Sequence, residues 1–186
     1  TIAQLCEGQI EELQHTYSVA RTVPSYLVSI EGKTASLFAT SARIGALVAG
    51  HDATVVDALT NYGTSFGMVF QIVDDILDVI ATDAELGKRA GHDMEEGVYT
   101  LPVLLTLAQQ SSDTDELRSF LGKPLSQSER ERALVVVRTH SGIQSAIESA
   151  KNYVFMAEAE CNLMPQGVAT DALRAAPAAL LASIIR

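Results

Sequence analysis

The sequence predicts an all-α fold, because three observations agree. Apolar side chains recur at the three- and four-residue spacing of helices along nearly the whole chain, and no segment alternates as a strand does. Hydrophobic residues make up 47% of the 186 residues and charged residues 19%, as in proteins that form a buried core. Turn residues interrupt the periodic stretches at intervals that suit helices. We expect one helical domain over residues 1–186.

Each expected helix begins and ends at residues with turn or capping chemistry. Pro24 suits the first turn of the second helix, Gly50 can close that helix, and Asp52 can cap the next one. The expected helices cover residues 2–18, 25–50, 53–81, 100–111, 113–122, 127–139, 142–163 and 169–185. Residues 82–99 form a long polar connection with several glycines, and such a loop is usually either functional or disordered.

Charge and cysteine content exclude several classes of protein. The formal charge is -10, from 13 basic and 23 acidic residues, and no basic cluster suits nucleic acid. Cys6 and Cys161 lie far apart, which favours a reduced, cytoplasmic setting. Residues 1–12 lack the pattern of a secretory signal, and no apolar stretch is long enough to span a membrane.

The helix expected over residues 53–81 carries the strongest functional signal. At about 100° per residue, Gln71, Asp74, Asp75 and Asp78 fall within an arc of about 100°, and apolar residues fill the rest of the circumference. A helix with so wide an apolar arc is mostly buried. Gly63 and Gly67 project onto the acidic side, and we expect them to leave room beside it.

Three carboxylates on one strip need a compensating cation. No Lys or Arg lies three or four residues from them, and crowded like charges raise one another's pKa values. Magnesium prefers a few carboxylate oxygens and then water or phosphate oxygens. The alternative is a solvated acidic face, but the wide apolar arc argues against it. We expect Asp74, Asp75 and Asp78 to hold Mg²⁺.

Four blocks together resemble the trans-prenyltransferases, the family of farnesyl, geranylgeranyl and longer polyprenyl diphosphate synthases. FQIVDDILD (residues 70–78) resembles the second aspartate-rich motif of that family. Residues 26–50 resemble its helix with a Lys-Thr pair, residues 86–107 its LGKxxGxDxxxG loop followed by TLP, and CEGQIEEL (residues 6–13) its opening pattern. The resemblance implies the isoprenoid-synthase helical bundle with its amino-terminal helices absent.

The resemblance also implies an activity and the residues for it. The family joins an allylic diphosphate to isopentenyl diphosphate with Mg²⁺, and its members commonly form homodimers. Asp74 would be the leading metal ligand, with Asp75 and Asp78 completing or orienting the shell through water. Lys33 and Thr34, on a helix whose inner stripe includes Leu37 and Ile44, would meet the allylic diphosphate. The remaining implied roles are diphosphate binding by Gln71 and Lys88, and positioning of Lys88 or metal-bound water by Asp93.

Two departures from the family pattern bear on the activity. Val98 stands where many relatives have a lysine, which favours a medium or long product over a farnesyl-type one. The first aspartate-rich motif does not occur in the sequence. We expect the natural protein to carry it before Thr1, and we expect the chain as printed to be inactive alone.

Three other readings remain to be weighed. A di-iron bundle needs paired Glu-x-x-His motifs, and only one occurs here, from Glu12 to His15. A non-catalytic subunit of a heteromeric prenyl synthase would explain the missing motif, although it has no need of intact metal ligands. A terpene cyclase shares the fold, but the Lys-Thr and GxDxxxG-TLP blocks favour chain elongation.

Overall fold

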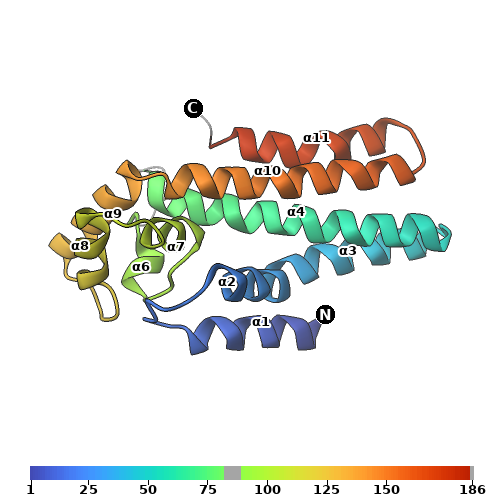
Figure 1. The fold of residues 1–186 in the computed structure, drawn as a ribbon. Coiled ribbons are helices and arrows are strands. Elements are labelled where there is room, and N and C mark those ends of the chain that lie inside the picture. Colours follow the sequence, from blue (N-terminus) through green and yellow to red (C-terminus); the bar gives the residue numbers. More distant parts are fainter. Residues whose placement is uncertain (82–88, 185–186) are drawn as a thin grey trace.

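The computed structural model describes residues 1–81 and 89–184, and these form an all-helical bundle without a strand, as the sequence predicts. The long helix α4 runs through the middle of the bundle, with α3 and α10 packed on either side of it (Figure 1). Helix α11 covers α10, and α1 lies at the opposite edge. The bounds are α1 Ile2–Gln14, α2 Val23–Ile30, α3 Ser36–Val48, α4 Ala53–Ile80, α10 Gly142–Glu160 and α11 Val168–Ala182.

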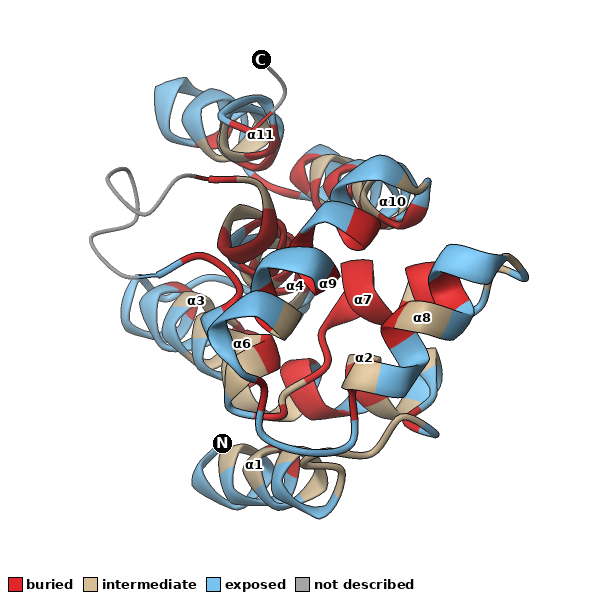
Figure 2. Cartoon of the chain, turned by 90° about the vertical axis from the view of Figure 1, so that its left-hand side faces the viewer, coloured by how far each residue is buried: buried red, intermediate tan, exposed pale blue. Residues whose placement is uncertain are grey.

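Shorter helices gather at the carboxyl end of α4. They are α6 (His92–Glu95), α7 (Leu101–Leu107), α8 (Ser112–Phe120) and α9 (Gln127–Thr139). Helix α7 is buried in the middle of this end, whereas the outer faces of α1 and α8 are exposed (Figure 2). The expected loop of residues 82–99 therefore contains one short helix, and its first part lies outside the described residues.

The predicted end of α3 at Gly50 and the predicted cap of α4 at Asp52 are confirmed. The side chain of Asp52 accepts a hydrogen bond from the backbone N–H of Val55 at 3.1 Å. Gly50 has φ +75°, a left-handed conformation that glycine adopts at little cost. Gly50 and Asp52 together reverse the direction of the chain between the two helices, so that α3 packs along α4.

The predicted helix of residues 25–50 is not one regular helix. Between α2 and α3 the backbone forms a π-helical turn, η1 (Glu31–Ala35), which carries Lys33 and Thr34. Helix α1 packs closely against this turn, where a Cβ on Gly32 would lie 2.7 Å from the carbonyl oxygen of Gln4. A π-helical turn inserts an extra residue into a helix and often accompanies a functional site.

The expectation that Gly63 and Gly67 leave room beside the acids is wrong. A Cβ on Gly63 would lie 2.7 Å from the Cα of Ala39, and one on Gly67 would lie 2.6 Å from the Cα of Ala35. Both glycines let the backbone of α3 and η1 approach α4 closely. They are packing positions, and the space beside them is filled.

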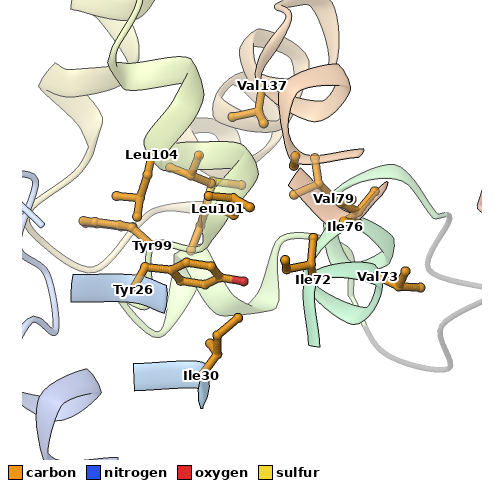
Figure 3. Packing of buried hydrophobic residues seen from close by; sticks show 14 of the residues in the cluster. Tyr26, Ile30, Ile72, Val73, Ile76, Val79, Tyr99, Leu101, Leu104 and Val137 are labelled. Atoms are coloured by element: carbon orange, nitrogen blue, oxygen red, sulfur yellow. The ribbon is translucent and has the colours of Figure 1, made fainter. Parts of the chain in front are cut away.

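The main core surrounds the carboxyl half of α4. Ile72, Ile76 and Val79 meet residues of α2, α7 and α9 there (Figure 3). The expected inner stripe of α3 is wrong in part, because Leu37 is 43% exposed and Ile44 is 55% exposed. Those two side chains face away from α4 in this chain. No helix in residues 1–81 or 89–184 is both long and apolar enough to cross a membrane.

Candidate functional site

A polar cavity of about 250 Å³ lies beside the carboxyl half of α4. It brings together side chains from α1, α2, η1, α4 and the segment around α6. Its lining residues are Glu12, Tyr26, Ile30, Lys33, Gln71, Asp74, Asp75, Asp93, Val98 and Thr100. The structure therefore places the predicted Lys33, Gln71, Asp74 and Asp75 around one space.

A larger groove, of about 780 Å³, runs along α1, η1 and α3. It includes Glu7, Glu31 and Arg43 but none of the residues that the sequence singled out. Size alone does not identify a site, because chemistry needs convergent polar groups. The smaller cavity has them.

Lys33 reaches into the cavity from η1 and is held by a carboxylate. Its Nζ donates to Oε1 of Glu12 at 2.7 Å, and the two side chains are 35% and 12% exposed. Glu12 comes from α1, so the ion pair joins two elements across the cavity. A partly desolvated ammonium beside open space is suited to meeting an anion.

The first two acids of the strip have different surroundings. Asp74 is exposed, whereas Asp75 is buried on the other side of the strip. The pKa of Asp75 is raised to about 8, and burial is the largest cause. Hydrogen bonds from Tyr26 and Gln71 act against this rise, and the carboxylates of Asp93 and Asp74 add to it. A cation in the cavity would favour the charged form of this carboxyl.

Gln71 and Thr34 are connected directly. Oγ1 of Thr34 donates to Oε1 of Gln71 at 2.8 Å, and Nε2 of Gln71 donates to Oδ1 of Asp75 at 2.8 Å. The predicted diphosphate-side threonine and glutamine thus lie within one hydrogen-bonded row. The row ends at a buried acid.

The third acid of the strip does not line the described part of this cavity. Asp78 is buried, and its Oδ2 accepts a hydrogen bond from the backbone N–H of Asp93 at 3.2 Å. Its backbone carbonyl also accepts from the N–H of Gly91 at 2.8 Å. Asp78 therefore ties α4 to the segment that brings Asp93 to the cavity. Lys88, the other predicted lysine, lies outside the described residues.

The residues of the cavity suit a magnesium ion that takes its remaining ligands from water and phosphate. In the described part of the chain, no three His, Cys, Asp or Glu side chains converge to hold an ion by themselves. The open carboxylate of Asp74 shares the cavity with an ammonium and an amide. Magnesium commonly binds through one or two carboxylates together with water and phosphate oxygens. The residues present fit such an ion.

Sequence reasoning missed three residues of this region. Glu12 and Tyr26 line the cavity, and buried Arg21 lies with its guanidinium carbon 5.5 Å from the centre of the Tyr26 ring. The sequence could have indicated Tyr26, because it lies seven residues before Lys33. This spacing is close to two helical turns and puts both residues on one helix face. Glu12 and Arg21 contact residues that are distant in the sequence, and helical periodicity does not predict such contacts.

Sequence comparison gives the same assignment as the motifs. The family model described as polyprenyl synthetase matches residues 1–137. Heptaprenyl diphosphate synthase component 2 of Bacillus subtilis is 33% identical over 175 residues, covering 94% of this chain and 50% of that protein. Nonaprenyl diphosphate synthase of Mycobacterium tuberculosis is 34% identical over 176 residues, covering 94% and 52%.

Solved structures share the arrangement of helices. Heptaprenyl diphosphate synthase from Staphylococcus aureus superposes with a TM-score of 0.90 at 28% identity, covering 97% of this chain and 57% of that one. Geranylgeranyl pyrophosphate synthase from Corynebacterium glutamicum, complexed with calcium and isoprenyl diphosphate, superposes at 0.88 with 32% identity, covering 98% and 57%.

These matches confirm the resemblance and the isoprenoid-synthase fold. The chain spans about half the length of the relatives that it matches. Motifs, fold and comparisons agree over nearly all of its residues, and the chain belongs to the polyprenyl synthetase family.

Proposed function

We propose that this chain, as one helical domain, forms part of the active site of a magnesium-dependent trans-prenyltransferase. The reaction would extend an allylic diphosphate with isopentenyl diphosphate. The observation that carries the proposal is the cavity in which Lys33 of η1 meets Gln71 and Asp74 of α4. The names of the relatives, all prenyl or polyprenyl diphosphate synthases, support it.

The chain's own residues would bind the diphosphate and prepare it to leave. Lys33 would exchange its contact with Glu12 for the diphosphate, beside the Thr34 hydroxyl and the Gln71 amide, and Lys88 would add a second charge. The allylic carbon–oxygen bond then breaks with its electron pair on the diphosphate. The double bond of isopentenyl diphosphate attacks the allylic cation, and a proton is lost. Apolar lining such as Ile30 reduces contact between water and the cation.

Asp74 would be the leading magnesium ligand, because its carboxylate is the open one. Asp75 and Asp78 would complete or orient the shell through water. When bound, magnesium would offset the negative charge that grows on the departing diphosphate. Asp93 would hold Lys88 or metal-bound water in place.

The proposal also covers product length, location and oligomeric state. Val98 lines the cavity where many relatives have a lysine, and with relatives named heptaprenyl and nonaprenyl synthases this favours a medium or long product. We place the enzyme in the cytoplasm as a homodimer. Exposed apolar residues on α3, among them Leu37, Ile44 and Leu47, suit burial against further protein.

Calorimetric titration of the 186-residue chain with inorganic pyrophosphate tests the proposal. We expect binding in magnesium chloride and a loss of about tenfold or more in affinity with EDTA, because the anion then lacks its bridging cation. Equal affinity for pyrophosphate in magnesium chloride and in EDTA would contradict the proposal. In a condensation assay with both substrates we expect no turnover by this chain alone.

A second function is favoured by the names of two relatives, from Bacillus subtilis and Geobacillus stearothermophilus. Each of the two is named as a component, so this chain could act as a non-catalytic subunit of a heteromeric prenyl synthase. The intact Lys33, Gln71 and Asp74 favour the catalytic reading. Co-purification with a prenyl synthase partner, without any binding of magnesium and pyrophosphate by the chain itself, would favour the subunit.

A further inference from the structure

Tyr26 donates a short hydrogen bond to the second acid of the strip. Its ring is 1% exposed, and its hydroxyl donates to Oδ2 of Asp75 at 2.6 Å. The hydroxyl points from α2 toward the helix that carries Ile72 (Figure 3). Both groups are buried, so water does not compete for this short bond.

The bond from Tyr26 is the first of three in one row. Asp75 accepts from Tyr26 on one oxygen and from Gln71 on the other, and Gln71 accepts from Thr34. The amide of Gln71 turns its nitrogen to Asp75 and its oxygen to Thr34, so each end of the amide has one partner in the row. The row therefore sets the orientation of Gln71 from a side chain that lies on another helix.

Tyr26 is itself held in place and kept as a donor. Burial raises the pKa of Tyr26 well above its usual value, and the nearby charge of Asp75 adds to this, so the hydroxyl keeps its proton. Arg21 lies over the ring, and its Nη1 donates to the carbonyl of Tyr99 at 3.2 Å. The ring thus has a cation on one face and little freedom to turn.

We propose that Tyr26 is a positioning residue, which fixes Asp75 so that this acid orients the Gln71 amide and leaves Asp74 as the carboxylate that meets the cation. This inference rests on the proposed diphosphate site and assigns its two adjacent acids to different tasks. Asp75 acts through Gln71, and Asp74 acts on the metal. The rival reading is that Tyr26 and Asp75 form a buried contact that only stabilises the fold.

The chain offers a matched control for a Tyr26→Phe variant. Tyr62 also lies on the bundle's inside, and its hydroxyl donates to the carbonyl of Leu173 at 2.8 Å. It precedes Asp74 by 12 residues on α4, which is about 18 Å along a helix. Tyr26→Phe and Tyr62→Phe each remove one buried hydroxyl bond, but only the first touches the row.

Calorimetry with magnesium chloride and inorganic pyrophosphate separates the two readings. We expect Tyr26→Phe to bind about tenfold more weakly than the unmodified chain and Tyr62→Phe to bind equally well. Equal affinity for Tyr26→Phe would overturn the inference. A double-mutant cycle sharpens this test, since Tyr26→Phe should have little further effect in a Gln71→Ala background. A full tenfold effect there would also overturn it.

A measurement without ligand keeps this inference distinct from the proposed function. In ¹⁵N-labelled protein, the side-chain amide protons of Gln71 should exchange slowly in the unmodified chain and in Tyr62→Phe, and faster in Tyr26→Phe. Unchanged exchange in Tyr26→Phe would refute the positioning role. If the unmodified chain binds no magnesium and pyrophosphate, the proposed function fails, whereas the exchange experiment still decides the role of Tyr26.

Discussion

The two halves of α4 present the same strip of the helix to different neighbours. In the amino-terminal half, Gly63 and Gly67 lie against the backbone of α3 and η1. In the carboxyl-terminal half, Gln71, Asp74 and Asp75 lie on the same side of the helix and border a polar cavity. One strip therefore serves close packing at one end and polar chemistry at the other.

The difference shows that a position on a helix face does not by itself define its role. The neighbouring element determines the role of each position. The glycines of α4 face the main chain of α3 and η1, whereas its polar residues face side chains of α2 and η1. Changes in the first half should therefore alter stability, and changes in the second half should alter binding. The variants below test that division, from the largest expected effect to the smallest.

The largest effect is expected from a side chain added in the packed half. Gly63→Ala should lower the free energy of unfolding by about 3 kcal/mol, because its Cβ would meet backbone atoms that cannot move alone. Urea unfolding measures this. Gly45→Ala is the control: nothing lies within 4 Å of its Cβ position in α3, so it should stabilise by about 0.5–1 kcal/mol. Equal effects at both positions would contradict the division.

Removing the ammonium in the polar half should affect binding most. Lys33→Ala should weaken magnesium-dependent binding of pyrophosphate by about fiftyfold, because a charged hydrogen-bond donor to the anion is lost. Calorimetry measures the affinity. The matched control is Lys151→Ala, which breaks only an exposed pair with Glu148 and should leave the affinity unchanged. A comparable loss in both variants would point to net charge as the cause.

Asp74→Asn should separate binding from stability. The side chain is exposed, so the free energy of unfolding should change by less than about 0.5 kcal/mol. The magnesium concentration needed for half-maximal pyrophosphate binding should rise about tenfold, because a neutral amide is a poorer ligand. A lower free energy of unfolding with an unchanged magnesium requirement would show that Asp74 stabilises the fold and does not bind the ion.

The smallest effect is expected at Thr34. Thr34→Val keeps the shape of the side chain and removes one hydrogen bond to Gln71. Affinity for pyrophosphate with magnesium should fall about fivefold, in line with one neutral hydrogen bond. Thr40→Val in α3 is its control, since that hydroxyl bonds to the carbonyl of Ser36 and to the hydroxyl of Thr1, both away from the cavity. An equal loss at Thr40 would show that the assay senses helix stability.

Local chemistry was enough to predict most of the helices and most of one side of the site. The bounds expected for α4 and α9 agree with the structure to within a residue, because capping by Asp52 and Ser126 acts within one turn. Periodicity also placed Asp74 and Asp75 together, since the two residues share a helix. Lys33 joined them in the prediction only through the family resemblance.

The parts that sequence reasoning missed all depend on contacts between distant segments. The meaning of Gly63 is set by Ala39, and the part played by Glu12 is set by a lysine 21 residues away. The π-helical turn at η1 interrupts a stretch whose apolar pattern reads as continuous helix. The assignment of metal and diphosphate roles to these residues stays a prediction until the binding experiments are done.

The π-helical turn sets which way the residues after it face. If Glu31–Ala35 formed regular α-helix with no residue removed, every later residue would turn by about 100° relative to α2. Either the Lys33 ammonium or the glycine-packed face of α3 would then point the wrong way. The one extra residue therefore lets a nearly continuous helical segment turn Lys33 toward the cavity and the next part of α3 toward the glycines of α4.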